Sequence, residues 1–456
     1  MTKNHLNHTL WLLLLVFGFL AASSFLPSFE LGPIHLQQVD LLSDIRKEFS
    51  DTLVAHVPTA DSLPDTSQIV QPKPELEVNP CPPGITCLED YSPGKKMMRP
   101  FFRALANRKS APVRIAFYGD SFIEGDIITE SLRDTLQELY GGRGVGYVPL
   151  ASEVTQYRLS ILHTYEGWNT YSLVSKQKTG YPLGISGYAF VPTVDNRASY
   201  RPGRNLRPKT FDQVRVFYMN HAPATLGYHI NDTLTFHEPL PVSDSLQHFL
   251  LEHEHMKSLT LNFTGDSLVA YGVSFENGSG VYVDNYAMRG NSGMALSALS
   301  EPLMQQFHDV QHYKLIFLQY GLNIVTERDT MNYVWYQSKM IKVVEQLKTR
   351  FPGAGIILMG ISDRAGNSSG KLQTIPAIKR MRDTQRNIAK RSQVAFWDLF
   401  EAMGGENSII SYVDTQPPLA AKDYTHLTFR GGELIARKLA QAMLFEKNRY
   451  ENKPLP

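Results

Sequence analysis

The stretch RIAFYGDSFIEGD, residues 114–126, decides the fold of this chain. Its apolar run, residues 115–118, stops at Gly-Asp-Ser, and apolar residues then recur with helical spacing through residues 128–139. A buried strand that passes directly into a helix is the opening unit of an α/β fold. Ser121 stands at the junction, where its hydroxyl can serve as a helix cap or as a nucleophile.

Short apolar strands alternate with helical patterns in the last third of the chain. Strands that are fully apolar and separated by helices indicate a parallel sheet with helices on both faces. The expected strands are 281–286, 314–320, 355–360 and 394–398, and the expected helices are 294–307, 331–351, 374–391 and 431–447.

Residues 153–282 have a different pattern. Strand-like runs such as QVRVFYMN, SLTLNF and LVAYGVSF are separated by turn residues, and no long helical pattern appears among them. We therefore predict an all-β unit, inserted between the first strand–helix element and the remaining ones.

The first 95 residues are predicted to lie outside these folded units. Residues 10–26, LWLLLLVFGFLAASSFL, form an apolar run between a signal-peptide core and a membrane span in length. We interpret residues 1–28 as a signal peptide or an inner-membrane anchor, so the body of the protein is expected outside the cytoplasm, in the periplasm. Residues 29–95 are rich in proline and polar residues and are interpreted as a linker.

Composition excludes some classes of partner. The net charge is +1 and no long basic run appears, so no nucleic-acid partner is expected. The two cysteines, Cys81 and Cys87, match no common zinc spacing. In an oxidising compartment they predict a small disulfide loop, with two free thiols as the alternative.

The Gly-Asp-Ser tripeptide occurs twice, and only its first copy is placed for chemistry. The second copy, at residues 265–267, lies between two strand patterns and is typical of a hairpin turn. Ser121 instead follows a buried strand at the carboxyl edge of a parallel sheet, the edge at which such sheets bind ligands.

A nucleophilic serine needs a base and a group that orients the base. Asp-x-x-His also occurs twice. Asp309 and His312 precede the strand 314–320, at the amino edge of the sheet, away from Ser121. Asp423 and His426 follow the last strand and precede the last helix, on the same edge as Ser121. The alternative for this second pair is that Asp423 or Thr428 caps the helix and His426 is merely exposed.

Two further loops at this edge supply hydrogen-bond donors for an oxyanion. Gly290 follows the strand 281–286, and a glycine lets a backbone N–H approach a ligand closely. Asn323 follows the strand 314–320 and has a side-chain amide that can donate. Each residue alone is also common in ordinary turns.

In chain order, Ser121, Gly290, Asn323 and the Asp423/His426 pair each follow a strand, and this arrangement resembles the SGNH/GDSL hydrolase family. The resemblance covers about residues 111–152 and 283–446. Phe122 stands where the usual signature has leucine, and Ile324 stands where many members have aspartate.

The family implies a three-layer α/β/α, flavodoxin-like fold and a role for each matching residue. The catalytic residues would be Ser121 as nucleophile, His426 as base and Asp423 as the group that orients it. The oxyanion donors would be the backbone amides of Ser121 and Gly290 and the side chain of Asn323. No cofactor and no metal are implied.

A narrower likeness is to bacterial peptidoglycan O-acetylesterases, which carry an inserted, carbohydrate-binding-like β-sandwich. It is carried by residues 101–126, by GGRGVGYVPL at 141–150 and by PLGISGYAF at 182–190. We therefore expect a hydrolase domain formed by residues 96–152 and 283–450, with the sandwich at 153–282.

The function expected from this likeness is removal of O-acetyl groups from a cell-envelope glycan, with peptidoglycan as substrate. Two alternatives stay open. One is a glycan O-acetyltransferase with the same triad, and the other is a non-catalytic glycan-binding protein of the envelope.

Overall fold

The computed structural model describes most of the chain after residue 80. The described residues are 81–154, 157–177, 180–206, 209–326, 332–368 and 370–452, together with Trp11 and residues 29–31 and 34–36. Residues 1–78 and 79–456 are two separate units. In the first, strands β1 (Phe29–Leu31) and β2 (Ile34–Leu36) pair antiparallel.

The predicted signal peptide or anchor, residues 1–28, and most of the predicted linker lie outside the described residues. Among the residues that are described, no helix combines the length and the apolar character needed to cross a membrane.

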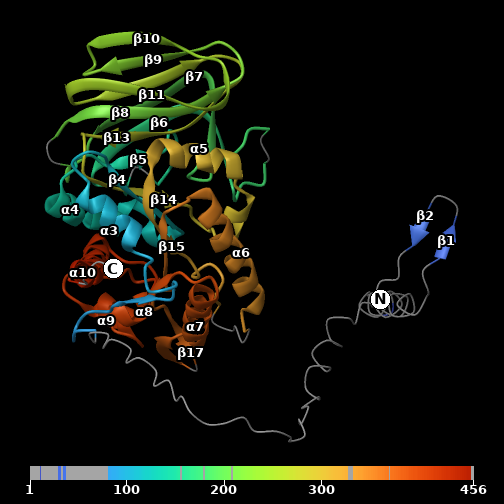
Figure 1. Ribbon diagram of the computed structural model, residues 1–456, viewed down its shortest axis with the longest axis vertical. Coiled ribbons are helices and arrows are strands. Elements are labelled where there is room, and N and C mark those ends of the chain that lie inside the picture. The colour runs from blue at the N-terminus through green and yellow to red at the C-terminus, as the bar shows by residue number, and fades with distance from the viewer. Residues whose placement is uncertain are drawn as a thin grey trace, which may run out of the picture. The chain divides into compact units, whose positions relative to one another are not determined.

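A parallel sheet forms the centre of the second unit (Figure 1), as the apolar strand patterns predicted. In its described part six strands lie in the order β14-β4-β15-β16-β19-β3, and the first five are parallel. Ranked along the chain, the parallel strands have the order 2-1-3-4-5, which is the flavodoxin-like order predicted. The bounds are β4 (Val113–Gly119), β14 (Val281–Ala287), β15 (Tyr313–Gln319), β16 (Gly355–Met359) and β19 (Ala395–Trp397).

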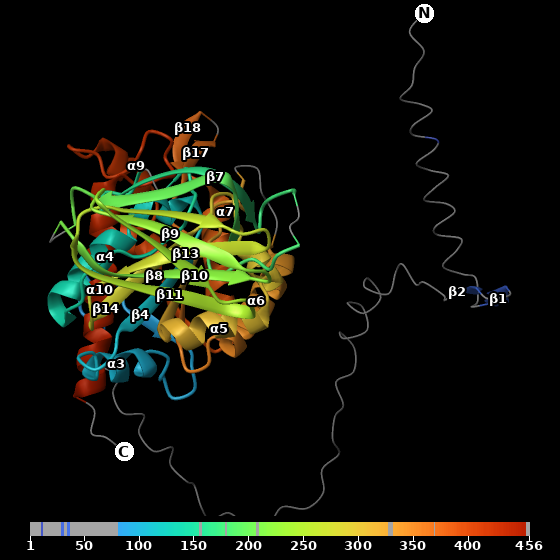
Figure 2. The ribbon, with the colours of Figure 1, turned by 90° about the horizontal axis from the view of Figure 1, so that it is seen from above.

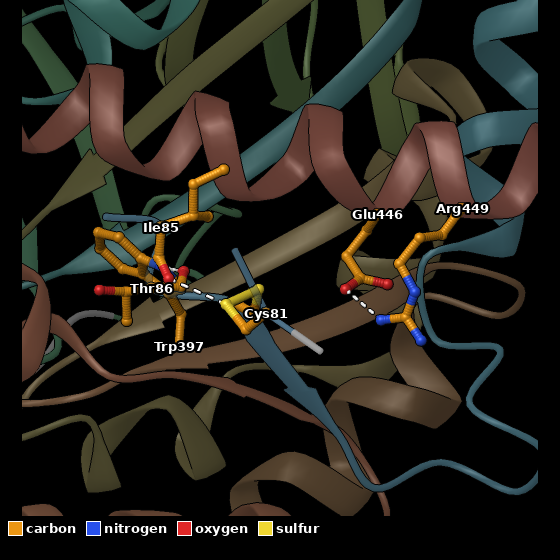
Figure 3. The surroundings of a disulfide bond; sticks show 7 residues. Cys81, Ile85, Thr86, Trp397, Glu446 and Arg449 are labelled. Carbon is orange, nitrogen blue, oxygen red and sulfur yellow. Dashed lines mark hydrogen bonds and ion pairs between the residues drawn. A yellow bond between two sulfur atoms is a disulfide. The ribbon is translucent and has the colours of Figure 1, made fainter. Parts of the chain in front are cut away.

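The sheet gains an edge strand that the sequence analysis did not foresee. Strand β3 (Leu88–Asp90) pairs antiparallel with β19, although it lies within the range predicted as linker. The predicted boundary at residue 95 is therefore too late. Next to β3 a disulfide joins Cys81 and Cys87, and Trp397 Nε1 donates to Thr86 O at 2.8 Å (Figure 3).

Helices cover both faces of the parallel sheet, in two groups that Figures 1 and 2 show on opposite sides. The long final helix packs on α4 and α3, and α6 packs on α5 and α7. The main helices are α3 (Arg99–Ala106), α4 (Thr129–Tyr140), α5 (Glu301–Gln311), α6 (Val334–Arg350), α7 (Pro376–Arg391) and α10 (Phe429–Glu451). Shorter elements are the 3₁₀ helices η1 (Ser121–Asp126) and η3 (Met294–Ala298), helices α8 (Leu399–Met403) and α9 (Ser408–Asp414), and the hairpin β17 (Ala365–Ser368) and β18 (Lys371–Thr374).

The chain between α4 and β14 forms the antiparallel sheet, drawn in green in Figure 1. Its nine described strands surround a separate apolar core that includes Phe190, Val216 and Phe263. The strands are β5 (Gly146–Val148), β6 (Ile161–Ser172), β7 (Tyr188–Pro202), β8 (Phe211–Asn220), β9 (Ala224–Ile230), β10 (Leu234–Leu240), β11 (Ser243–Met256), β12 (Leu259–Thr264) and β13 (Leu268–Glu276). Strand β5 pairs with β13, so this sheet already begins before residue 153.

The antiparallel sheet packs directly on the α/β part. The ring of Phe307 on α5 lies 5.4 Å from that of Phe217 and 5.6 Å from that of Tyr271. Arg114 of β4 forms an ion pair at 2.6 Å with Glu276 at the end of β13, and both side chains are buried. The β-rich segment is thus held against the sheet by apolar packing and by buried charge.

Candidate active site

Ser121 lies at the point where the strand order of the parallel sheet reverses. It follows β4, which lies between β14 on one side and β15 on the other. The next strand along the chain, β14, is added on one side of β4, and the later strands are added on the other side. Open α/β sheets bind ligands at the carboxyl ends of strands at this position. A Cβ on Gly119 would stand 2.7 Å from the side chain of Ile123, so glycine allows the tight turn from β4 into η1.

Three side chains from distant parts of the sequence meet at this edge. Ser121 Oγ lies 3.0 Å from His426 Nε2, and His426 Nδ1 lies 2.6 Å from Asp423 Oδ2. The base can therefore take the serine proton on one nitrogen while the carboxylate holds the other. His426 is half-buried and Asp423 is more exposed.

The loop that carries Asp423 and His426 is held by its own hydrogen bonds. Asp423 Oδ1 accepts from the backbone N–H groups of Thr425 and His426, each at 3.0 Å. Partial burial alone would raise the pKa of Asp423, but the hydrogen bonds from His426 and Thr425 outweigh it and lower that pKa. Thr428, one of the alternatives considered for the cap, does cap α10, and this leaves Asp423 free to orient His426.

The oxyanion donors predicted from the sequence lie in loops beside Ser121. Ser121 is the first residue of η1, so its N–H has no acceptor within that helix. Gly290 has φ 73° and is exposed at the end of β14. Asn323 Nδ2 donates to Asp120 Oδ2 at 3.0 Å and to Asn291 O at 3.1 Å. Both amide hydrogens of Asn323 are thus engaged in the structure, and one must be shared or released to serve an oxyanion.

Asp120, beside the nucleophile, has a role that the sequence analysis missed. Its side chain is fully buried and accepts from Phe122 N at 2.9 Å as well as from Asn323. Burial raises the pKa of Asp120 to about 6, and the hydrogen bond from Phe122, the charge of His426 and the bond from Asn323 limit the rise. This carboxylate connects the turn that carries Ser121 with the loop that carries Asn323.

Asp120 should make the stability of the protein depend on pH. Because its folded-state pKa of about 6 lies above that of an unfolded aspartate, the unfolded chain loses this proton first as the pH rises. The stability contributed by protonated Asp120 is full below about pH 4 and is lost as the pH rises through about 6. Asp120→Asn removes this titration. We expect the difference in free energy of unfolding, wild type minus variant, to fall by on the order of 3 kcal/mol between pH 4 and pH 7.

Urea unfolding of both proteins at several pH values measures this difference. Asp266→Asn, at the exposed second Gly-Asp-Ser copy, is the matched control. A difference that stays constant from pH 4 to pH 7 would show that Asp120 does not titrate in this range.

A buried ion cluster supports the end of the Ser121 turn. Asp126 Oδ2 accepts from Arg158 Nη2 at 2.9 Å and also contacts Arg133. Burial alone would raise the pKa of Asp126, but the two guanidinium groups more than offset it and hold the pKa well below its usual range. Since Arg158 precedes β6, this cluster links the antiparallel sheet to the active-site turn.

The site opens into a pocket of about 590 Å³. Ser121 and His426 lie on its wall, beside apolar side chains and an ion pair that the sequence analysis did not identify. The remaining lining residues are Glu124, Gly125, Ile127, Tyr157, Arg289 and Phe429. The sequence does contain one hint of this ion pair, because a charged residue, Arg289, stands directly before the predicted site residue Gly290.

The structure separates the duplicated motifs as predicted. Gly265–Ser267 forms a turn between β12 and β13. Asp309 lies on α5, and His312 ends that helix before β15, at the amino edge of the sheet. Among the described residues, no group of three or more His, Cys, Asp or Glu side chains is placed to hold a metal ion.

The comparisons with known proteins give similarity in structure but not in sequence. No model of a protein family matches the sequence, and no curated protein matches it. Among solved structures, a peptidoglycan O-acetylesterase has a TM-score of 0.64 at 21% identity, covering 79% of this chain and 99% of that protein.

Two further solved structures match at much lower TM-scores. A salicylyl-acyltransferase from a tetracycline biosynthetic pathway gives a TM-score of 0.28 at 12% identity, over 63% of this chain and 98% of its own. An acetylxylan esterase from Geobacillus stearothermophilus gives 0.28 at 21% identity, over 37% and 74%.

The match to the peptidoglycan O-acetylesterase extends beyond the α/β part. The ranges predicted for the hydrolase domain make up about half of the chain, and the matched share is larger. The common architecture therefore includes strands of the antiparallel sheet. The chain therefore shares the fold of that solved structure, with a flavodoxin-like parallel sheet and an attached antiparallel sheet, as the sequence patterns predicted.

Proposed function

We propose that this protein is a serine esterase that removes O-acetyl groups from a cell-envelope glycan, with peptidoglycan as the substrate. The observation that carries the proposal is the continuous chain of contacts from Ser121 Oγ through His426 to Asp423. It lies at the carboxyl edge of the sheet and opens on a pocket. Both features are what acyl transfer to a serine requires.

In the first half of the reaction, His426 Nε2 takes the proton of Ser121 as Oγ attacks the ester carbonyl carbon. The carbonyl oxygen becomes an oxyanion, which the amides of Ser121, Gly290 and Asn323 stabilise. The intermediate then collapses and the bond to the sugar oxygen breaks. His426 gives its proton to that oxygen, which leaves an acetyl group on Ser121 and a free sugar hydroxyl.

In the second half, a water molecule replaces the sugar. His426 takes a proton from the water as its oxygen attacks the acetyl carbonyl carbon, and the same donors stabilise the second oxyanion. Collapse of this intermediate releases acetate, and His426 returns the proton to Ser121 Oγ.

The choice of substrate rests on likeness and on the shape of the site. A solved structure that shares this fold over 79% of the chain is a peptidoglycan O-acetylesterase. The pocket beside Ser121 is open, which suits an ester on a polymer. The Cys81–Cys87 disulfide agrees with a protein that works outside the cytoplasm.

Acetate release from O-acetylated peptidoglycan tests the proposal. We expect wild-type protein to release one free acetate for each ester lost, and Ser121→Ala to release none above the buffer rate. Peptidoglycan stripped of its esters by mild base is the substrate control. Acetyl groups that reappear on an added glycan acceptor instead of as acetate would identify a transferase. Binding without any loss of ester would identify a glycan-binding protein.

A further inference from the structure

Two backbone donors of the proposed oxyanion site lie in separate loops. The Ser121 amide begins the turn after β4, and the Gly290 amide lies in the turn after β14. The two strands are parallel neighbours, and the ladder ends with Met288 N donating to Gly119 O at 2.9 Å. Beyond this point, side chains must hold the two turns in register.

An ion pair joins the two turns just past the end of the ladder. Arg289 Nε donates to Glu124 Oε1 at 3.2 Å, and Arg289 Nη2 contacts Glu124 Oε2. Glu124 stands three residues after Ser121, and Arg289 stands directly before Gly290. Paired contacts between a guanidinium and a carboxylate fix orientation as well as distance.

The two side chains of the ion pair differ in exposure. The Glu124 side chain is only 10% exposed, whereas that of Arg289 is 70% exposed. The buried carboxylate sits in a kinked part of η1, where Gly125 has φ 65°. Glu124 is therefore the more buried partner of the ion pair.

One side of Gly290 faces open space. Apart from Gly290 and its neighbours Arg289 and Asn291, no atom of the described residues lies within 4 Å of the place where a Cβ on Gly290 would stand. On the other side Asn291 is buried, its Oδ1 accepts from Gly293 N at 2.9 Å, and its carbonyl accepts from Asn323. Asn291 N also donates to Met288 O at 3.2 Å and closes the turn that contains Gly290, so the Arg289–Glu124 contact is the side-chain link from this turn to the Ser121 turn.

We propose that the Glu124–Arg289 ion pair is a positioning device that sets the Gly290 N–H relative to the Ser121 N–H in the oxyanion site. The inference rests on the proposed function, because it assigns a reason for the pair within that chemistry. Both side chains line the pocket, and the hydrogen bonds described for them join them to each other. The pair acts through Gly290, and its effect should appear in the transition state and not in substrate binding.

The expected effect follows from what one oxyanion donor contributes. Loss of such a donor lowers kcat by about 10²- to 10³-fold. Breaking the ion pair misplaces the Gly290 donor without removing it, so we expect kcat to fall by about 10- to 100-fold, with KM changed less than about threefold. Arg289→Lys keeps the charge but loses the paired geometry, and it should retain an intermediate kcat.

The experiment compares Arg289→Met, Arg289→Lys, Glu124→Gln and the double variant Glu124→Gln/Arg289→Met on a chromogenic acetate. Inhibition by methylboronic acid, whose serine adduct mimics the tetrahedral intermediate, is measured alongside. Loss of the Glu124–Arg289 ion pair should weaken inhibition by about the same factor by which kcat falls. The kcat of the double variant should be no lower than that of Arg289→Met. Arg437→Met, which breaks an exposed ion pair with Glu433 on α10, is the matched control.

The outcomes separate this inference from the function on which it rests. Wild-type protein could hydrolyse the acetate ester through Ser121 while Arg289→Met and Arg289→Lys keep the wild-type kcat and inhibition. This result would contradict the positioning role of the ion pair and leave the proposed esterase function intact. A higher KM with an unchanged kcat would also contradict the positioning role of the ion pair. If wild-type protein has no esterase activity, both proposals fall. Arg289→Lys keeps the test valid even if Arg289→Met does not fold.

Discussion

Replacing Ser121 with alanine is expected to lower kcat on an acetyl ester by at least about 10⁴-fold, because no other group at the site can form the acyl-enzyme. Ser121 Oγ is the atom that His426 Nε2 contacts at 3.0 Å, so its loss removes the nucleophile and leaves the base without a partner. The side chain is only half-buried, and the unfolding transition should therefore change little. Initial rates with a chromogenic acetate and a thermal unfolding curve measure the two effects.

Ser267→Ala is the matched control for this experiment. Ser267 stands in the other Gly-Asp-Ser copy, in a turn between β12 and β13. The same chemical change there should leave kcat within about twofold of wild type, since surface changes away from a site have small effects. An Ser121→Ala variant that is folded and hydrolyses the ester at the wild-type rate would remove Ser121 from the mechanism.

The second large effect is expected for Asp423→Asn, with kcat reduced by about 10³- to 10⁴-fold. Asp423 Oδ2 contacts His426 Nδ1 at 2.6 Å and keeps the other ring nitrogen free to accept the serine proton. Because hydrogen bonds lower the pKa of Asp423, this group stays ionised through neutral and mildly acidic pH. An amide has no such charge and can hold the ring in the wrong tautomer.

Steady-state rates of Asp423→Asn and of Asp309→Asn test this role. Asp309 belongs to the other Asp-x-x-His copy, on α5 at the opposite edge of the sheet, so its variant should keep the wild-type kcat. Equal rates for Asp423→Asn and wild-type protein would show that His426 does not need Asp423, and the triad would reduce to a dyad.

The fold was predictable because its signals are local. The parallel strands are short apolar runs, and Ser121, Gly290 and Asn323 each come soon after a strand. His426 lies in the loop before the last helix, after the short helices α8 and α9. The carboxyl ends of parallel strands share one edge, so chain order alone places these residues together. The structure adds the distances, such as 3.0 Å between Ser121 and His426.

The parts that could not be predicted depend on contacts between distant segments. Strand β3 has three residues and is defined by its pairing with β19, more than 300 residues later in the chain. Strand β5 is equally short and is defined by its pairing with β13. The assignment of residues 29–95 as linker therefore failed at its carboxyl end, where composition is a weaker guide than pairing.

The supporting charges at the site were missed for the same reason. Asp120 in the turn after β4 reads as an ordinary turn residue until the structure shows it buried against Asn323. Glu124 and Arg289 lie 165 positions apart and pair only because β4 and β14 are neighbours. Sequence motifs thus indicated the reacting groups, whereas the groups that hold them in place required the tertiary structure.

Formation of an acyl-enzyme on Ser121 can be tested by covalent labelling of the serine. A fluorophosphonate that mimics an acetyl ester is incubated with the protein, and peptide mass spectrometry locates the adduct. We expect a single adduct on Ser121, formed far more slowly in Asp423→Asn and absent from Ser121→Ala. An adduct on another residue, or none in a protein that still releases acetate from its substrate, would contradict it.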